Sequence, residues 1–253
     1  MNFIFDLDGT ICFKGQKISS GIADLLVELE QAGHVVGFAS ARPCRDMLPV
    51  LDERLRNRLL IGANGAMTYF GGELQASVPI PAGLAKELLH LLQEFDAEYL
   101  IDDRWNYACR MADSHPFLRF VDPDKLAARI ELDQIESYMK IVVLSGSDFG
   151  ELSRRLERMD VTIHHHSTEG ILDLTYKGVN KMSALELSGI PGGPFVCFGN
   201  DMNDLPLFEK AHHSVAIGDY EPLLRIAKER IPADEHTERS IIRKLRELGE
   251  RYA

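Results

Sequence analysis

Short apolar runs alternate with amphipathic stretches along the first third of the chain. The segments Phe3–Phe5, "VVGFAS" (35–40) and "LLIGANGA" (59–66) predict strands, and such runs are typical of parallel sheets that helices cover on both faces. Between the first two, "ISSGIADLLVELEQAGH" carries apolar residues at helical spacing behind a serine cap and ends at Gly33. A second helix is predicted from about Cys44 to Arg58. This βαβαβ order predicts a parallel sheet.

The pattern changes after Pro79 and Pro81. A helical stretch over 82–95 is followed by strand-like segments around 99–101, 139–144, 161–166 and 171–176, which predict a separate α+β domain in the middle third. From Asn180 the earlier alternation resumes, with helix 180–189, strand 195–200, helix from 203, strand 214–218 and helices from 221 and 238. The last third is therefore expected to complete the first sheet, and the Pro/Gly-rich "GIPGGP" (189–194) to form a loop.

Composition and charge narrow the possible functions. With 253 residues and 45% hydrophobic content, the chain is long enough for one large domain or two smaller ones. Its net charge of −11 argues against a general nucleic-acid or anionic-membrane surface, so an anionic substrate would need a local positive site. The four cysteines are not closely paired, which favours reduced thiols. The chain has no basic leader and no apolar run near the roughly 20 residues that span a bilayer, so we expect a cytoplasmic protein.

Polar residues stand at the ends of several predicted strands. Asp6 follows the first strand and Asp8 lies two residues later, so two like charges are held close together. Ligands of open α/β sheets bind beyond the carboxyl ends of the strands, where Ser40 and "GNDMND" (199–204) also lie. A divalent cation between carboxylates would turn their repulsion into shared coordination, and Mg²⁺ suits oxygen ligands. Lys181, at the start of a predicted helix, would supply positive charge for a phosphate.

These motifs, in this order, resemble those of the haloacid dehalogenase-like phosphatases, and within them the Cof-like branch. The chain carries DxDGT as residues 6–10, the strand-end serine as Ser40 in "SAR", the lysine as Lys181 in "GVNK", and the fourth motif as "GNDMND". The branch also has an Asn-Gly pair after the third strand, matched by Asn64 and Gly65, and inserts its cap between the second and third motifs. The resemblance spans nearly the whole chain. It implies an α/β protein with a Rossmann-like parallel-sheet core (1–80 and 177–253) and an inserted α+β cap domain (81–176).

The resemblance also implies a mechanism and a set of site residues. Asp6 would attack phosphorus and form an aspartyl-phosphate, while Asp8 protonates the leaving alkoxide and later deprotonates the hydrolytic water. The substrate would be a small phosphorylated metabolite, with a sugar phosphate as the first expectation, and the cofactor would be Mg²⁺. The implied phosphate-binding groups are the Ser40 hydroxyl, Lys181, Asn203 and the backbone N–H groups of Leu7 and Ala41. The implied metal-binding residues are Asp6, Asp8, Asn200, Asp201 and Asp204.

Two positions depart from the family pattern. Asn200 stands where the family usually has an acidic metal ligand, so either its amide oxygen or the next residue, Asp201, is expected to replace that ligand, with weaker Mg²⁺ binding. Asp204 aligns with the second acidic position, and Ala41 stands where glycine is common but keeps the N–H donor.

Two other functions stay open. One is a phosphosugar mutase of the same superfamily, and the other is a metabolite-binding regulator with little turnover, which the intact carboxylate pair of the first motif argues against.

For the histidines and the tryptophan outside the motifs, the sequence favours structural roles over chemical ones. On a strand, His165 of the "HHH" segment (164–166) points opposite to its two neighbours, which favours a polar strand face over a metal site. His212 and His213 lie between a predicted helix and a predicted strand, where a loop role suffices. Trp105, in the hairpin-like "DDRWNYACR" (102–110), is interpreted as a packing residue, with stacking on a substrate ring as the alternative. The pattern carries no signal for the oligomeric state.

Overall fold

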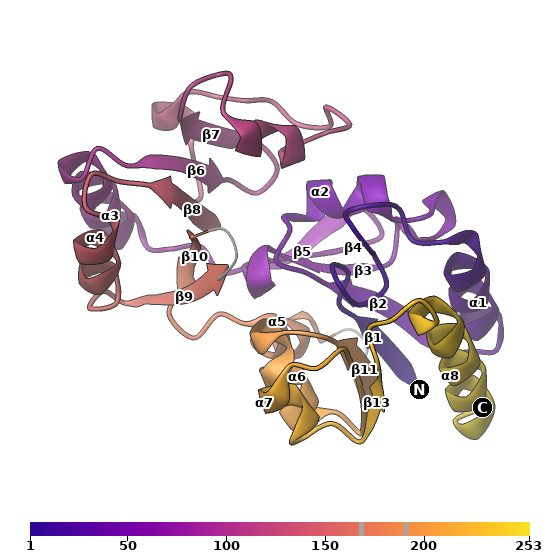
Figure 1. Cartoon of the computed structure of the whole chain (residues 1–253). Helices are drawn as coiled ribbons and strands as arrows, with labels where there is room; N and C mark the ends of the chain where they lie inside the picture. Colours follow the sequence, from indigo (N-terminus) through magenta and orange to yellow (C-terminus); the bar gives the residue numbers. More distant parts are fainter. Residues whose placement is uncertain (167–169, 190–191) are drawn as a thin grey trace. The chain divides into compact units, whose positions relative to one another are not determined.

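The structure is a computed structural model that describes residues 1–166, 170–189 and 192–253 of the chain. It divides into two compact units. The first unit consists of Met1–Ala76 and Asn180–Ala253, and the second consists of Ser77–Val179. Figure 1 labels the helices and strands of both units along the chain.

The first unit is built on a sheet of eight strands among the described residues, in the order β13-β12-β11-β1-β2-β3-β4-β5. The pairs from β13 to β3 are all parallel, which confirms the predicted parallel sheet, and β4 is antiparallel to β3. All four residues of the central β1 are buried, as the first apolar run predicts. The strands are β1 (Asn2–Phe5), β2 (Val35–Ala39), β3 (Leu59–Gly62), β4 (Met67–Phe70), β5 (Glu73–Ser77), β11 (Phe195–Gly199), β12 (His213–Ile217) and β13 (Glu229–Ile231).

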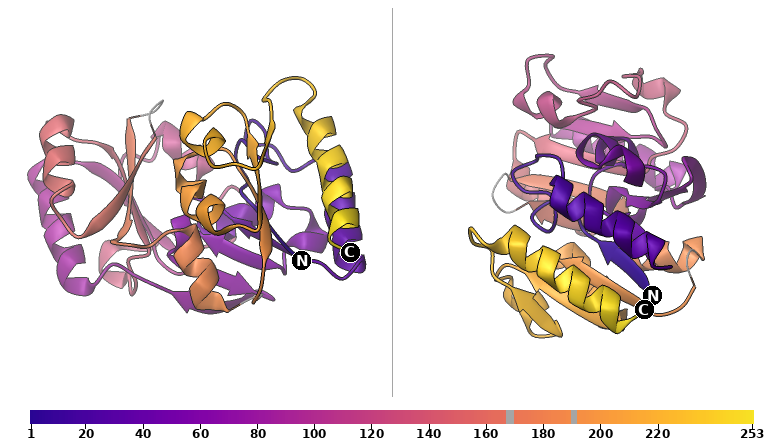
Figure 2. Two further views of the ribbon diagram at one scale, coloured as in Figure 1. Left: turned by 90° about the horizontal axis from the view of Figure 1, so that it is seen from below. Right: turned by 90° about the vertical axis from the view of Figure 1, so that its right-hand side faces the viewer.

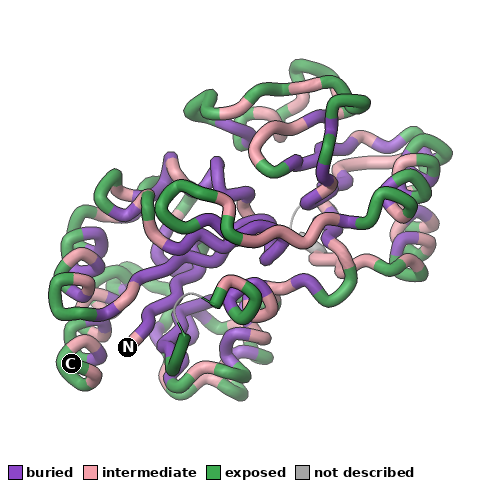
Figure 3. The backbone as a smooth tube through the Cα atoms, turned by 180° about the vertical axis from the view of Figure 1, so that it is seen from behind, coloured by how far each residue is buried: buried purple, intermediate pink, exposed green. Residues whose placement is uncertain are grey.

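Helices cover both faces of this sheet (Figure 2). On one face lie α1 (Ser20–Gln31) and α8 (Thr237–Arg251), and on the other lie α5 (Lys181–Ser188), α6 (Leu205–Lys210) and α7 (Glu221–Leu224). α1 begins at its predicted cap, because the Ser19 hydroxyl accepts the N–H of Ile22, and α5 ends at Gly189, which is left-handed. Figure 3 shows the central strands as buried backbone between these layers.

The helix predicted over 44–58 is wrong in its length. Only α2 (Cys44–Met47) is α-helical, and short 3-10 turns follow it at 48–50 and 53–55. Pro49 has no N–H to donate, and the chain is extended between the two turns. The Asp52 carboxylate accepts the N–H of Arg54, a local hydrogen bond that competes with a continuous helix.

The strand predicted over 59–66 also ends early. β3 stops at Gly62, and Ala63 and Asn64 have positive φ angles of 52° and 56°, which a strand does not allow. This left-handed turn leads into β4, which the hydrophobic pattern does not predict. Gly71 and Gly72 then connect β4 with β5 at the edge of the sheet.

The second unit is an antiparallel sheet with, among its described residues, two α-helices, which confirms the predicted α+β organisation. Its five strands, counted over the described part of the chain, run in the order β7-β6-β8-β10-β9. Leucines of both helices, among them Leu88 and Leu152, pack on the apolar residues of one sheet face. The elements are α3 (Ala82–Glu94), β6 (Glu98–Asp102), β7 (Tyr107–Arg110), β8 (Lys140–Ser145), α4 (Phe149–Leu156), β9 (Val161–His166) and β10 (Ile171–Tyr176).

The other face of this second sheet carries a buried charge cluster. Lys140 Nζ lies 3.1 Å from Asp173 Oδ2 and 3.9 Å from Asp102 Oδ2, and all three residues are buried. Asp102 and Lys140 are register partners on neighbouring strands, so their side chains share one face. Trp105 lies in the turn between β6 and β7, where its indole N–H donates to the Leu126 carbonyl at 2.8 Å.

His213 does not lie where the sequence predicts, whereas the "HHH" segment does. His213 is the first residue of β12, buried, with its Nε2 2.9 Å from Glu229 Oε1 on the neighbouring β13, so its predicted loop role is wrong. β9 includes the "HHH" segment, as predicted, but the side chains of His165 and His166 lie outside the described residues, as do residues 190 and 191 of the predicted loop 189–194. No helix in the described ranges combines the length and the apolar character needed to cross a membrane.

Candidate active site

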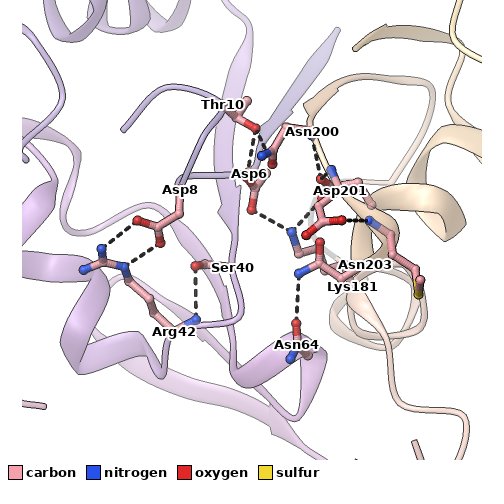
Figure 4. Close-up of polar contacts among 12 residues, drawn as sticks. Asp6, Asp8, Thr10, Ser40, Arg42, Asn64, Lys181, Asn200, Asp201 and Asn203 are labelled. Atoms are coloured by element: carbon pink, nitrogen blue, oxygen red, sulfur yellow. Dashed lines mark hydrogen bonds and ion pairs between the residues drawn. The ribbon is translucent and has the colours of Figure 1, made fainter. Parts of the chain in front are cut away.

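Three polar side chains stand at the carboxyl ends of neighbouring strands (Figure 4). Asn200 follows β11, Asp6 follows β1 and Ser40 follows β2, and these three strands are adjacent in the parallel sheet. β1 pairs residue for residue with both neighbours, and β2 and β11 extend one residue beyond it, so the three strand ends lie within one residue of one another. The structure thus brings together the strand-end residues that the sequence pattern singles out.

The loop after β1 turns tightly around the Leu7 carbonyl. This carbonyl accepts the backbone N–H groups of residues 10, 11 and 12 at 3.1, 3.0 and 2.8 Å. Gly9 makes the turn possible with a φ of 81°, which other residues rarely adopt. A Cβ at Gly9 would also lie 2.3 Å from the side-chain amide of Asn200. The glycine of the first motif therefore lets the loops after β1 and β11 approach closely.

A buried lysine joins two buried carboxylates in the centre of the site. Lys181 is the first residue of α5, and its Nζ lies 2.7 Å from Asp6 Oδ1 and 2.6 Å from Asp204 Oδ1. Burial would lower the pKa of Lys181, but the two carboxylates outweigh burial and raise this pKa, so the ammonium stays charged. Burial raises the pKa of the Asp6 carboxyl to about 7, although the Lys181 charge opposes that shift. The site therefore combines a permanent cation with a carboxyl of high proton affinity.

Asp204 organises the loop after β11. Its Oδ2 accepts the backbone N–H groups of Asn200 at 2.9 Å and of Asp201 at 3.2 Å. Asp201 itself is exposed, and its carboxylate accepts the N–H of Met202 at the start of a 3-10 turn. The two acidic residues of the fourth motif thus have different surroundings: Asp204 is buried within the site, and Asp201 caps the turn at its edge.

Asp8 is turned toward Arg42. Both oxygens of its carboxylate accept hydrogen bonds from the guanidinium, at 2.6 Å from Nε and 2.7 Å from Nη2. The Asp8 side chain is 47% exposed, so solvent reaches it, in contrast to the buried Asp6. The backbone N–H of Arg42 donates to Ser40 Oγ at 3.1 Å, and Ala41 lies between these two residues in the turn after β2. The second motif therefore fixes the arginine that holds Asp8.

Two asparagines connect the fourth motif with the turn after β3. Asn203 Nδ2 donates to Asn64 Oδ1 at 3.0 Å, and Asn64 is buried in its left-handed conformation. A Cβ at Gly65 would lie 2.2 Å from the Asn180 carbonyl oxygen, so this turn approaches the start of α5 without a side chain between them. The Asn-Gly pair thus supports the start of α5, from which Lys181 projects.

Oxygen atoms surround the side-chain amide of Asn200. Its nearer amide atom lies 3.0 Å from Asp6 Oδ2, 3.2 Å from the Asp8 backbone carbonyl and 3.2 Å from Thr10 Oγ1. A carboxylate and a carbonyl are ligands that Mg²⁺ accepts, and the amide would add its own oxygen, so this donor set fits a hard cation. Within the described residues, no three His, Cys, Asp or Glu side chains are grouped so as to hold a metal. A cation here would therefore depend on the carbonyl and the amide.

Thr10, Arg42 and Asn64 belong to the site although motif matching gives them no chemical role. Thr10 Oγ1, for example, donates to Asp6 Oδ2 at 2.8 Å. Each of the three lies within or directly beside a motif, so position in the sequence is the signal that points to them. What the motifs do not contain is the direction of each side chain, which the turns after β1, β2 and β3 determine.

Comparisons with known proteins identify the family. The model of the haloacid dehalogenase-like hydrolases matches residues 3–243. An HMP-PP phosphatase of Serratia proteamaculans is 24% identical over 261 residues, which cover 94% of this chain and 91% of that protein. The solved sugar phosphatase BT4131, of HAD subclass IIB, is 19% identical with a TM-score of 0.78 over 98% of both chains. TM0651 from Thermotoga maritima is 22% identical with a TM-score of 0.77 over 96% of both chains.

Fold and site together define an α/β enzyme core with a carboxylate pair, a buried lysine and an asparagine-containing loop at one edge of a parallel sheet. The chain belongs to the haloacid dehalogenase-like hydrolase family. This result confirms the resemblance that the four ordered motifs predict. The solved structures, at these identities, establish the shared fold.

Proposed function

We propose that the chain is a Mg²⁺-dependent phosphatase that hydrolyses a small phosphorylated metabolite through an aspartyl-phosphate on Asp6. The observation that carries this proposal is the place of Asp6, which ends the central buried strand and shares the Lys181 ammonium with Asp204. Such a carboxylate is suited to attack a phosphoryl group, because the cation attracts the phosphate that the carboxylate alone would repel. The phosphatase names of the relatives support the same reaction class.

The two carboxyls of the first motif would divide the reaction. In the first step, an Asp6 oxygen bonds to phosphorus, the bond from phosphorus to the leaving oxygen breaks, and Asp8 gives that oxygen a proton. In the second step, Asp8 takes a proton from water, the water oxygen bonds to phosphorus, and the bond to Asp6 breaks to release phosphate. Asp8 is exposed enough to exchange protons with solvent and Asp6 is buried, which suits these two roles.

The groups around Asp6 would hold the phosphoryl oxygens and the cation. Those proposed for the phosphoryl oxygens are the Ser40 hydroxyl, the Lys181 ammonium, Asn203 and the N–H groups of Leu7 and Ala41. Mg²⁺ would be held by Asp6, the Asp8 carbonyl and Asn200, with Asp201 as the alternative to Asn200, and it would supply positive charge that screens the nucleophile from the phosphoryl group. Asp204 Oδ1 accepts the Lys181 ammonium and its Oδ2 accepts the backbone N–H groups of Asn200 and Asp201, so we assign Asp204 to positioning Lys181 and the loop.

The proposed substrate class is a sugar phosphate or a phosphorylated metabolite of similar size. BT4131 is a sugar phosphatase, and the relative from Serratia is an HMP-PP phosphatase. A net charge of −11 disfavours a polyanion bound over a wide surface. A small anion would instead contact single cations at one site, here Lys181 and Arg42, together with the proposed Mg²⁺, which offsets the carboxylates that pair with them.

Phosphate release from an aryl phosphate tests this function. Wild-type protein should release phosphate with excess Mg²⁺, and a chelator should abolish the release. Asp6→Asn should lose roughly 10³-fold or more in kcat, because an amide is a poor nucleophile. Asp24→Asn, the same change at an exposed position of α1, should keep full activity. If Asp6→Asn keeps more than a tenth of the wild-type rate, Asp6 is not the nucleophile.

A further inference from the structure

Only one end of the Asn200 amide satisfies its neighbours. Both Asp6 oxygens act as acceptors, Oδ1 for the Lys181 ammonium and Oδ2 for the Thr10 hydroxyl. Asp6 Oδ2 and the Asp8 carbonyl oxygen, which can only accept, lie 3.0 and 3.2 Å from the nearer amide atom of Asn200. Thr10 Oγ1 lies 3.2 Å away, and its one proton is already donated to Asp6 Oδ2. An amide oxygen in that place would face three acceptors, whereas an amide NH₂ can donate to them. We therefore place the Asn200 side-chain nitrogen toward Asp6, because only this orientation supplies protons to the neighbouring acceptors.

These acceptors include the oxygens of Asp6 and Asp8 that the proposed function assigns to the cation. An amide NH₂ presents two polarised protons to them, and so it supplies part of the positive charge that a cation would supply. We propose that the Asn200 amide is a built-in substitute for the cation: its nitrogen side joins the loops after β1 and β11, and a half-turn of the same amide presents its oxygen to Mg²⁺. This inference rests on the proposed function for the identity of the cation.

The surroundings of Asn200 allow such a turn. Its backbone is anchored, because its N–H donates to Asp204 Oδ2 at 2.9 Å, so the loop does not depend on the side chain alone. The amide packs over Gly9, where a Cβ would come within 2.3 Å of it. The residue type at position 9 therefore keeps the space that the amide uses, and rotation about the last side-chain bond exchanges its two ends.

An aspartate at position 200 could bind the cation through its oxygens but could not donate hydrogen bonds to the loop after β1. Its carboxylate would face two acceptors, Asp6 Oδ2 and the Asp8 carbonyl, with no proton to donate, so the two loops would repel one another until a cation bound. Asp6 is 5% exposed, so water screens this repulsion poorly. Compared with an aspartate, the amide thus binds the cation more weakly but keeps the two loops joined at low Mg²⁺ concentration.

Thermal unfolding and calorimetric titration with Mg²⁺, both without substrate, test the proposal. Wild-type protein should unfold at nearly the same temperature in a chelator and in millimolar Mg²⁺. Asn200→Asp should unfold about 5 °C lower in the chelator, recover in Mg²⁺, and bind Mg²⁺ about tenfold more tightly than wild type. Asn57→Asp, the same change at an exposed position of the same unit, should show none of these shifts.

The proposal is overturned if Asn200→Asp matches wild type in the chelator, if wild type responds to Mg²⁺ as strongly as the variant, or if the affinities are equal. Should Asn200→Asp not fold, Asn200→Ala replaces it: this variant must unfold below wild type in the chelator and gain nothing from Mg²⁺, and wild-type stability would refute the role of the amide. Failure of the proposed function is a separate result, namely wild-type protein that releases no phosphate at any Mg²⁺ concentration.

Discussion

Replacing Lys181 with methionine should be among the most damaging single changes in the first unit. The ammonium is fully buried and lies 2.7 and 2.6 Å from two buried carboxylates, so Lys181→Met keeps much of the side-chain volume and removes the charge. Asp6 and Asp204 would then share a dry site without the cation between them. Removing one partner of a buried ion pair in this way costs about 3–5 kcal/mol of unfolding free energy.

Urea unfolding followed by circular dichroism measures this loss. The double variant Lys181→Met/Asp204→Asn should regain part of the stability, because it removes one of the two charges and its amide oxygen can still accept a backbone N–H. Lys210→Met, the same change at the exposed end of α6, should alter the unfolding free energy by less than about 0.5 kcal/mol. A loss below about 1 kcal/mol for Lys181→Met would refute the charge argument.

The pH dependence of the same variant separates charge from packing. Burial raises the pKa of Asp6 from 3.8 to about 7, so between these values the folded state holds a proton that the unfolded state releases. The resulting stabilisation is complete below the lower value and is lost as the pH rises through the upper one. Lys181 lowers this pKa, so in Lys181→Met the pKa of Asp6 should lie above the wild-type value of about 7. As the pH falls toward about 7, only the folded variant takes up the proton, so its loss of unfolding free energy relative to wild type should shrink there and stay constant below. A deficit independent of pH would place the loss in packing.

Three further changes test other parts of the account. Arg42→Lys should lower kcat about tenfold, because lysine cannot make both of the hydrogen bonds that fix the Asp8 carboxylate. Steady-state kinetics with the aryl phosphate measure this change, and an unchanged kcat would remove Arg42 from the mechanism. Lys140→Met should destabilise the second unit by about 3 kcal/mol in urea unfolding, because it removes the cation between two buried carboxylates. The Trp105 indole N–H donates to the Leu126 carbonyl, so Trp105→Ala should lower the melting temperature and leave the relative rates across a panel of phosphorylated metabolites unchanged. Altered relative rates would instead favour contact between Trp105 and the substrate.

Much of the candidate site follows from the sequence alone. Asp6, Ser40 and Asn200 each stand directly after an apolar run, and parallel strands end at one edge of their sheet, so the pattern is enough to bring them together. The caps of α1 and α5 follow in the same way, because Ser19 and Gly189 act through local backbone geometry. Strand order within β1-β2-β3 and within β11-β12-β13 is equally local in origin, since short crossovers link these neighbouring strands, whereas the pairing of β1 with β11 joins residues 2–5 to residues 195–198.

The remaining features depend on contacts between distant parts of the chain. The ion pair of Asp8 with Arg42 requires the tight turn at Gly9, which decides where the Asp8 carboxylate points. The orientation of the Asn200 amide depends on the protons of neighbours that lie on another loop. The helix predicted over 44–58 fails for a local reason instead, because Pro49 and an extended segment interrupt an otherwise helical pattern of apolar residues. Hydrophobic periodicity carries none of this information.

Trapping the phosphorylated enzyme tests the central claim most directly. Asp8→Asn lacks the base that activates water, but 4-nitrophenyl phosphate, used as the aryl phosphate, has a leaving group that departs as a stable anion, so this variant should still transfer the phosphoryl group to Asp6. Acid quenching after mixing with Mg²⁺ and the aryl phosphate, followed by mass spectrometry of the peptides, should find the phosphoryl group on Asp6 in Asp8→Asn and no phosphorylated peptide in Asp6→Asn. Phosphate release by the wild-type protein, with no phosphoryl group on Asp6 of Asp8→Asn at any quench time, would contradict the account.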